Sequence, residues 1–310
     1  MGGPKPLVPV LVGPTAVGKT AVVMALSRDW RITVISADSR QVYRGLDIGT
    51  AKPTKEEQKR VTHLGIDIVE PGKRYSAGRF AIDAAAWFTE LPEESQPMVV
   101  GGTGFYVRAL ADGLFKEPPI DPKRRERLRA WAKASDGLGR WAARLDASYA
   151  GGGRQRAARV IEVALLTGRP LSWWQREAKA EGVMTPWYVF LTVPRAVLYR
   201  RIAERTQAML EAGWVEEVER ILDKGLAADA PGLDAVGYRE ITKYLRGELQ
   251  HTELLDTIVK STRRYAKRQE TWFRHQLRSE AVLPLDATKP PEEVARAIKD
   301  HWNEGGCGCG

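Results

Sequence analysis

One short stretch restricts the possible folds of this 310-residue chain more than any other. Residues 13–20 have the sequence Gly-Pro-Thr-Ala-Val-Gly-Lys-Thr, which fits the pattern G-x-x-x-x-G-K-[ST]. An apolar run at 8–12 precedes it, and residues 19–28 follow with apolar side chains at helical spacing. The sequence therefore predicts a strand, a glycine-rich loop and a helix in that order, which is the arrangement of loops that bind phosphate groups.

The rest of the core alternates between strand and helix patterns. This alternation is typical of a parallel sheet joined by crossover helices, so an α/β fold with flanking helices is predicted. Strands are expected at 32–35, 98–100 and 188–193, and helices at 80–91, 196–211, 215–224 and 254–276.

The pattern changes in the middle of the chain. Basic helices are expected at 123–134 and 154–167, separated by Gly151-Gly152-Gly153, and no strand pattern lies between them. We therefore predict an all-helical subdomain inserted into the sheet domain. The predicted divisions are a core of 1–117 and 186–304, an insertion of 118–185 and a mobile tail of 305–310.

The charge of the chain indicates a polyanionic partner. The 48 Lys and Arg exceed the 39 Asp and Glu by nine, an excess that favours partners rich in phosphate, with solubility alone as the alternative. No apolar run reaches the roughly 18 residues of a membrane helix. The N-terminal segment lacks a signal-peptide core, and the spacing of Cys307 and Cys309 is unsuited to zinc. We expect a cytoplasmic protein without a membrane anchor.

The loop at 13–20 has the groups that hold a diphosphate or triphosphate. Its glycines let backbone N–H groups turn toward phosphate oxygens, Lys19 adds a positive charge, and the Thr20 hydroxyl can bind Mg²⁺. Kinases, NTPases and enzymes that release diphosphate share such a loop, so the loop does not decide which bond breaks. The predicted phosphate-binding residues are Gly13, Pro14, Thr15, Ala16, Val17, Gly18, Lys19 and Thr20.

Two further polar residues follow predicted strands. Asp38 comes after the strand at 32–35, and Thr103 follows the strand at 98–100 within Gly-Gly-Thr-Gly. Open α/β sheets bind ligands at the carboxyl edge of their strands, so both side chains are expected beside the phosphate loop. A helix cap or an indirect Mg²⁺ partner is the alternative for Asp38, and a turn hydroxyl is the alternative for Thr103.

Several segments accompany the loop in a fixed order: DS at 38–39, DIGTAKP at 47–53, GGTGFY at 101–106, GYRE at 237–240 and TRRYAKRQ at 262–269. Together with the loop they resemble the bacterial tRNA dimethylallyltransferases from residue 7 to about residue 278. The segment at 47–53 is the most diagnostic, because ordinary P-loop kinases lack it.

The resemblance implies transfer of a dimethylallyl group from dimethylallyl diphosphate to N6 of adenosine 37, in tRNAs reading codons that begin with U. It also implies a P-loop kinase-like core, an insertion that grips the anticodon stem-loop, and a monomer. The alternatives are an adenylate prenyltransferase acting on free nucleotides, a P-loop small-molecule kinase or NTPase, and a non-catalytic RNA-binding module. The basic insertion and the basic helix at 254–276 favour tRNA.

The chemistry of prenyl transfer gives several residues a role. Breaking an allylic C1–O bond places negative charge on diphosphate, which calls for fixed donors and Mg²⁺. Adenine N6 loses a proton as it is alkylated, and Asp38 is the candidate base. Arg201 and Arg205 lie four residues apart on one helix face. The family alignment favours Arg205 as the diphosphate contact, with Arg201 as the substitute, and it places Thr103 beside the reacting atoms.

RNA contacts are expected along the helix at 254–276 and in the insertion. One stripe of that helix is basic, at Lys260, Arg264, Lys267, Arg274 and Arg278, and another is expected to pack inward, at Ile258, Tyr265 and Trp272. Adjacent Trp173 and Trp174 favour packing over base stacking. Gly151-Gly152-Gly153 departs from relatives that have Asn or Asp there, which leaves contacts from that turn open. The implied tRNA contacts are Asp38, Ser39, Arg40, Gln41, Thr103, Arg125, Gln155, Arg156, Ala157, Ala158, Arg159, Tyr238, Arg239, Arg264, Lys267, Arg268 and Gln269.

Overall fold

The computed structural model describes residues 5–115, 118–178, 180–277 and 282–305. Arg278, Cys307, Cys309 and nearly all of the predicted tail lie outside these residues.

The chain divides into two compact units. The first combines Met1–Ala111 with Val183–Gly310, and the second is Asp112–Gly182. The sheet domain is therefore discontinuous in sequence. The inserted unit begins and ends a few residues earlier than the predicted 118–185, because the chain leaves the core directly after the helix that ends at Asp112.

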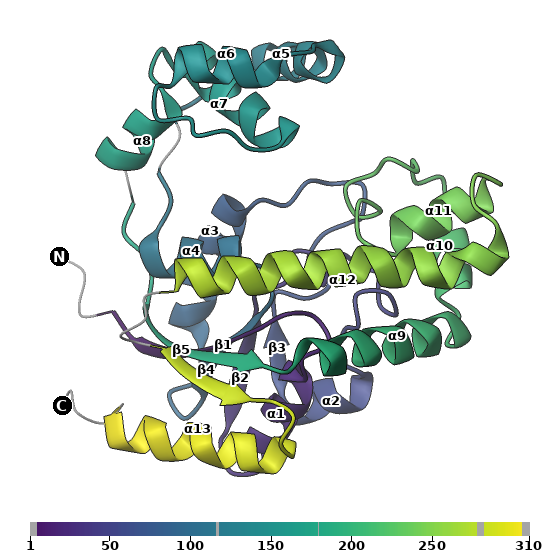
Figure 1. The fold of residues 1–310 in the computed structure, drawn as a ribbon. Coiled ribbons are helices and arrows are strands. Elements are labelled where there is room, and N and C mark those ends of the chain that lie inside the picture. Colours follow the sequence, from purple (N-terminus) through teal and green to yellow (C-terminus); the bar gives the residue numbers. More distant parts are fainter. Residues whose placement is uncertain (1–4, 116–117, 179, 278–281, 306–310) are drawn as a thin grey trace. The chain divides into compact units, whose positions relative to one another are not determined.

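A six-stranded parallel sheet forms the centre of the first unit (Figure 1). Its strands are β1 (Leu7–Val12), β2 (Ile32–Ser36), β3 (Thr62–Leu64), β4 (Gln96–Gly101), β5 (Thr185–Thr192) and β6 (Val282–Asp286). Their order is β3-β2-β4-β1-β5-β6, and Val10 of β1 lies opposite both Val99 and Tyr188. Central strands of such a sheet are buried on both faces, which explains their unbroken apolar runs. The predicted α/β class is confirmed.

Helices cover both faces of this sheet. The helices of this unit are α1 (Lys19–Leu26), α2 (Lys55–Arg60), α3 (Ala77–Glu90), α4 (Gly104–Asp112), α9 (Arg195–Glu211), α10 (Trp214–Asp223), α11 (Tyr238–Leu245), α12 (His251–Gln276) and α13 (Pro291–Gly305). Figure 1 shows α1 and α13 on one side of the sheet and α3, α4 and α12 on the other. Leu11 packs in a core with Val23 of α1 and Ile298 of α13. On the opposite face, the rings of Phe190 and Phe273 have centroids 6.0 Å apart.

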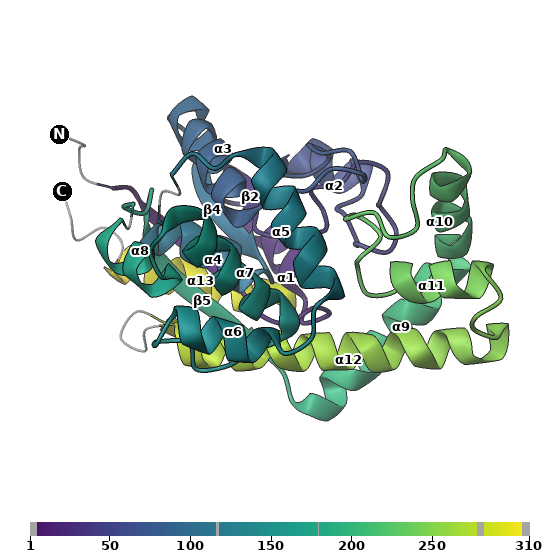
Figure 2. The ribbon, with the colours of Figure 1, turned by 90° about the horizontal axis from the view of Figure 1, so that it is seen from above.

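A group of three helices lies beside the N-terminal part of α12 (Figure 2). Ile202 of α9 packs with Val259 and Ala266 of α12. Trp214 of α10 and Tyr238 of α11 meet edge to face, with ring centroids 5.6 Å apart. These contacts fix α9, α10 and α11 next to the loops that leave the carboxyl ends of the strands.

The described residues of the second unit are helical and contain no strand, as predicted. Its helices are α5 (Pro122–Ala134), α6 (Leu138–Leu145), α7 (Arg154–Thr167) and α8 (Leu171–Glu177). Leu138, Ala142 and Ile161 form part of its own apolar core. The Trp174 Nε1–H donates to Thr167 Oγ1 at 2.8 Å, and its ring meets Trp173 edge to face at 5.0 Å. Both contacts agree with the packing role expected for the two tryptophans.

The sequence patterns missed β3, β6, α2, α4, α6, α8, α11 and α13. Helix α2 buries none of its residues, so it has no apolar periodicity, although its Thr54–Glu57 capping box is a signal of a helix start. Strand β6 contains Pro284 and lies at the edge of the sheet, where a proline is tolerated but weakens the strand pattern. Among the described residues, no helix is both long and apolar enough to cross a membrane.

Candidate active site

The phosphate loop connects β1 to α1 and depends on two of its glycines. A Cβ on Gly13 would lie 2.8 Å from the Leu191 carbonyl oxygen, and Gly18 has a φ of 112°. Neither position accepts a larger side chain without strain. The Lys19 Nζ donates to the carbonyl oxygens of Gly13 and Pro14 at 2.9 and 3.0 Å. The predicted loop therefore forms, and the Lys19 ammonium group lies over the backbone of the loop.

Lys19 shares its surroundings with Asp38 and Arg205. Burial lowers the pKa of Lys19 to about 8, the Asp38 carboxylate raises it, and the Arg205 guanidinium lowers it. Burial also lowers the pKa of Arg205, whereas Asp38 raises it. Two cations and one carboxylate thus act on one another at the mouth of the loop. An anion bound there would stabilise the charged form of Lys19.

The loops that carry Asp38 and Thr103 meet where β2 and β4 end, at the carboxyl edge of the sheet where both residues were expected. The Asp38 Oδ1 accepts the N–H of Arg40 at 2.8 Å, which fixes the turn after β2. The Thr103 Oγ1 accepts the N–H of Ser39 at 3.0 Å, and the Thr103 N–H donates to the Ala37 carbonyl at 3.0 Å. Thr103 therefore joins the two loops and supports the turn that presents Asp38.

Tyr265 belongs to this site, although the sequence placed it on a packing stripe. The pKa of Tyr265 is raised to about 12, chiefly by burial and also by the Asp38 carboxylate, while the neighbouring Arg40, Thr103 and Arg268 lower it. The side chain lines the same cavity as Asp38 and Arg205. Helical spacing identified the inward face of α12, but it does not tell whether that face meets apolar side chains or a cavity.

A cavity of about 230 Å³ opens above these groups. Its lining combines polar side chains, including Asp38, Arg205 and Arg268, with apolar ones, including Met209 and Val236. Its lining residues are Thr15, Ala16, Asp38, Arg40, Gly49, Thr50, Ile202, Arg205, Thr206, Met209, Trp214, Asp234, Ala235, Val236, Arg239, Thr262, Tyr265 and Arg268.

Of the two candidate arginines, Arg205 faces the cavity and Arg201 does not line it. The Arg201 guanidinium donates to the carbonyl oxygens of Val17 and Ala287, both at 3.0 Å. Arg201 therefore supports the phosphate loop from behind by tying it to the segment after β6. This arrangement agrees with the preference for Arg205 as the residue that reaches a ligand.

The segment at 47–53 forms a wall of the cavity and is held by a buried carboxylate that the sequence analysis missed. Glu217 of α10 is 4% exposed, and its Oε2 accepts the N–H groups of Asp47 and Ile48 at 2.9 and 2.8 Å. Its Oε1 accepts the Tyr238 hydroxyl at 2.5 Å. A Cβ on Gly49 would lie 2.0 Å from Trp214 Nε1, so this position requires glycine.

Three of the residues predicted to contact tRNA have side chains that are buried and engaged inside the protein. Tyr238 is fully buried and bonds to Glu217, and Ala157 packs in the core of the helical unit. Gln269 is also buried, and its amide bonds to Thr15 and Gly102. These residues lie inside segments that match the family, and a segment match does not tell which of its members face outward.

Other predicted contacts lie at the surface or around the cavity. The side chains of Lys260, Arg264, Lys267 and Arg274 are exposed along α12, which forms the basic stripe expected within the described residues. Arg268 lines the cavity with its guanidinium 5.7 Å from the Tyr265 ring centroid.

The loop after β2 and the start of α11 supply further polar groups. Arg239 lines the cavity and pairs with Asp234 at 3.4 Å. Arg40 also lines the cavity, and its guanidinium donates to the Pro231 carbonyl. The Gln41 amide bonds to Ser36 and to the Thr50 and Ala51 carbonyls, so it holds the cavity wall in place.

In the helical unit, the basic side chains gather around one acid. Gln155 and Arg156 are exposed, and Ala158 packs against the core. The buried Glu162 carboxylate accepts Arg129 at 2.7 Å and Arg159 at 2.8 Å, and it pairs with Arg125 at 3.4 Å. Three guanidinium groups on one carboxylate leave an excess of positive charge on this unit.

The described residues offer a place for a hydrated cation but no protein cage. No group of three or more His, Cys, Asp or Glu side chains that would hold a metal occurs among them. The Thr20 hydroxyl lies on an exposed residue in the first turn of α1. Because Mg²⁺ usually keeps several waters and binds few side chains together with phosphate oxygens, this donor set fits Mg²⁺ held largely by a phosphate ligand.

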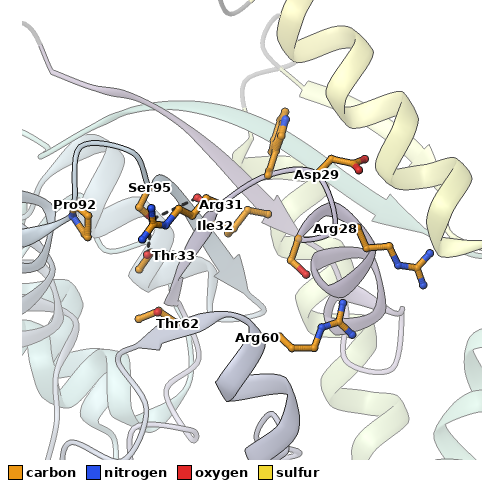
Figure 3. Close-up of a pocket in the computed structure, with 11 residues that line it drawn as sticks. Arg28, Asp29, Arg31, Ile32, Thr33, Arg60, Thr62, Pro92 and Ser95 are labelled. Carbon is orange, nitrogen blue, oxygen red and sulfur yellow. Dashed lines mark hydrogen bonds between the residues drawn. The ribbon is translucent and has the colours of Figure 1, made fainter.

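A second cavity, of about 420 Å³, lies at the opposite edge of the sheet, where β2, β3 and β4 begin (Figure 3). Arg28 and Arg31 line it, but they are paired with Glu292 at 3.2 Å and Glu94 at 2.5 Å. These two arginines are therefore neutralised by neighbouring carboxylates.

Comparison with known sequences identifies related proteins. The IPP transferase family pattern matches residues 41–276, and the isopentenyl transferase pattern matches residues 6–71. The chain is 41% identical over 280 residues to tRNA dimethylallyltransferase 1 of Trichlorobacter lovleyi, covering 88% of this chain and 92% of that protein. It is 40% identical over 320 residues to the tRNA dimethylallyltransferase of Thermomicrobium roseum, covering 97% and 94%.

Solved structures give the same result. The tRNA isopentenylpyrophosphate transferase of Bacillus halodurans superposes with a TM-score of 0.70 at 34% identity, over 97% of both chains. A eukaryotic dimethylallyltransferase acting on tRNA superposes with a TM-score of 0.78 over 96% of this chain and 80% of that one. Its identity is 23%, so that likeness shows the fold alone.

Proposed function

The chain belongs to the IPP transferase family of tRNA-prenylating enzymes, and we propose that it transfers the dimethylallyl group of dimethylallyl diphosphate to N6 of adenosine 37. The proposed substrates are the anticodon stem-loops of tRNAs that read codons beginning with U. We propose further that the enzyme is a cytoplasmic monomer.

The observation that carries this proposal is one cavity with two kinds of wall. Arg205 and Arg268 line it and provide positive charge beside Thr15 and Ala16 of the phosphate loop, whereas Met209 and Val236 provide apolar surface. Lys19 lies outside the lining but close enough to Arg205 and Asp38 to interact with their charges. A diphosphate ester of a short branched hydrocarbon has the same division between an anionic and an apolar end. A nucleoside triphosphate bound for phosphoryl transfer has no need of an apolar wall beside the phosphates.

The leaving group is proposed to bind at the loop. Lys19 leaves the Gly13 and Pro14 carbonyl oxygens and donates to the diphosphate, while Arg205 approaches from α9. Both cations stabilise the negative charge that grows as the C1–O bond breaks. Mg²⁺ bound by the Thr20 hydroxyl and phosphate oxygens would neutralise further charge on the departing diphosphate.

The nucleophile is proposed to enter beside Asp38. As the bond between N6 and C1 forms, the nitrogen becomes acidic and its proton passes to the Asp38 carboxylate. The Oδ1 bond to the Arg40 N–H holds this carboxylate in place, and Thr103 fixes the loop behind it. Extruding the adenine from the loop of the RNA costs a few kcal/mol, which phosphate contacts to exposed basic residues such as Lys267 offset.

The test supplies radiolabelled dimethylallyl diphosphate together with tRNA, with AMP, or with neither. Label is expected in tRNA alone, and mass spectrometry of nuclease fragments should find it on adenosine 37. Label in AMP but never in tRNA would replace the proposal by an adenylate prenyltransferase. Label in neither, with ATP-dependent phosphorylation of a small molecule, would indicate a kinase. The matched control is Asp38→Asn, which keeps the shape of the side chain and removes the base.

A further inference from the structure

Gln269 of α12 lies between the two loops that form the reacting centre. Its Oε1 accepts the Thr15 N–H at 2.9 Å, and its Nε2 donates to the Gly102 carbonyl oxygen at 2.9 Å. The side chain is 7% exposed, whereas the neighbouring Arg268 is exposed. Its amide is therefore not available to RNA, and one side chain joins segments that are far apart in the sequence.

The two joined loops have different roles in the proposed reaction. Thr15 belongs to the phosphate loop after β1, and Gly102 immediately precedes Thr103 after the adjacent strand β4. The distance between these loops decides how far the departing diphosphate lies from the incoming adenine. Gln269 is the side chain that bridges them by two hydrogen bonds.

The bridge requires an amide in one orientation. The side chain must accept on one side and donate on the other, which an amide does and an ionised carboxylate does not. The approach is also close, because a Cβ on Gly102 would lie 2.2 Å from Gln269 Nε2. Tyr265, four residues earlier on the same helix face, interacts with the Thr103 side chain. One face of α12 therefore contacts both loops, and the other face exposes basic residues.

We propose that Gln269 is a positioning residue that sets the separation between the diphosphate site and the Thr103 turn, an inference that rests on the proposed function. Gln269 touches neither substrate and acts through the backbone of Thr15 and Gly102. Loss of the Gln269 amide changes the alignment of C1 with N6 and therefore lowers the rate of the chemical step. It also lowers the affinity for diphosphate, whereas the affinity for tRNA is retained.

The test compares Gln269→Met and Gln269→Glu with the wild type. Methionine keeps the volume and loses both bonds, and the single-turnover rate is expected to fall by about 100-fold, the loss that a small misalignment produces. Binding of inorganic diphosphate, measured by calorimetry, should weaken as well. The tRNA Kd should stay within about threefold, because phosphate contacts elsewhere dominate it.

Gln269→Glu adds a readout that a general loss of structure would not give. The ionised carboxylate accepts from Thr15 but repels the Gly102 carbonyl, whereas the protonated acid donates to it and restores both bonds. Burial beside a carbonyl raises a carboxyl pKa above its usual value of about 4.3. The rate relative to the wild type should therefore recover as the pH falls from about 8 toward about 5. The other titratable groups of the site are the same in both proteins, so the ratio isolates the new carboxyl.

The matched controls are Gln276→Met and Gln276→Glu, which make the same changes at an exposed position of the same helix. They should leave the rate and diphosphate binding unchanged. Wild-type rates and diphosphate affinity in both Gln269 variants would overturn the proposal, and so would a loss confined to tRNA affinity. If the wild type itself transferred no prenyl group, the proposed function would fail, while the diphosphate measurements would still decide whether Gln269 positions the loop.

Discussion

Replacing Glu217 tests whether a buried carboxylate holds the 47–53 segment as a cavity wall. The Glu217 carboxylate accepts two backbone N–H groups at 2.9 and 2.8 Å and the Tyr238 hydroxyl at 2.5 Å. Glu217→Ala removes the acceptor of these three donors and of the Gly49 N–H, which lies 3.5 Å from Oε1, and each unsatisfied buried donor costs about 1–3 kcal/mol. Because the surrounding structure relaxes, the low end of this range applies. We expect the free energy that holds the 47–53 segment in place to fall by about 3–5 kcal/mol.

Glu217→Gln is the matched variant, because it keeps the shape and changes only the charge. Its amide oxygen replaces Oε2 and accepts both N–H groups, while its NH₂ group donates to the Tyr238 hydroxyl, which turns to accept. Two things are lost: the assistance of the charge, which makes such bonds roughly twice as strong as neutral ones, and the long bond of 3.5 Å from the Gly49 N–H to Oε1. The free energy that holds the 47–53 segment in place is expected to fall by about 1–2 kcal/mol.

Hydrogen exchange measures how much each variant loosens the 47–53 segment. A loss of about 3 kcal/mol corresponds to more than 100-fold faster exchange of the Asp47 and Ile48 amides in Glu217→Ala, since about 1.4 kcal/mol equals a factor of ten. Exchange in Glu217→Gln should rise by about tenfold. Prenyl transfer should fall in the same order, because Gly49 and Thr50 line the cavity. Equal exchange in the two variants, or an unchanged rate in Glu217→Ala, would refute the reasoning.

Three other predictions concern the substrates. Asp38→Asn should abolish turnover in single-turnover assays and leave the tRNA Kd within severalfold, since one carboxylate contributes little to binding dominated by phosphates; near-normal turnover would reject Asp38 as the base. Reversing the charges of Lys267 and Arg268 should weaken tRNA binding and flatten the slope of log Kd against log salt concentration by about 1–2. An unchanged slope would mean that neither side chain contacts phosphate. Because burial lowers the pKa of Lys19 to about 8, the free enzyme loses the Lys19 charge as the pH rises through that value. Diphosphate binding near this pH should therefore take up more protons than in Lys19→Met, as calorimetry in two buffers would measure, and equal uptake would contradict the assignment.

The parts of the fold that the sequence predicted are determined by residues close together in the chain. The phosphate loop depends on the spacing of Gly13, Gly18 and Lys19, and the central strands are apolar on both faces because helices cover them. Asp38 and Thr103 were placed together correctly because both follow parallel strands, whose carboxyl ends lie at one edge. Each of these predictions follows from residues close together in sequence or from one simple rule of sheet geometry.

The residues that the sequence did not predict depend on partners far along the chain. Glu217 resembles any acidic residue at the start of a helix until the fold brings Asp47 and Ile48 against it. Gln269 lies in a basic segment typical of RNA contacts, yet its partner Thr15 is 254 positions away. Tyr265 was assigned to the inward face correctly, but its surroundings are a cavity. Periodicity predicts the direction in which a side chain points, but only the tertiary structure shows what the side chain contacts.

The contact of Arg201 with Val17 and Ala287 bears on how the protein is made. The phosphate loop leaves the ribosome long before Ala287 and α13, which packs beside α1. Synthesis must therefore pass β6 before the rear support of the loop has both of its contacts. A nascent chain halted after α12 would have every residue proposed to meet substrate, but the Arg201 guanidinium would lack Ala287 as its second anchor.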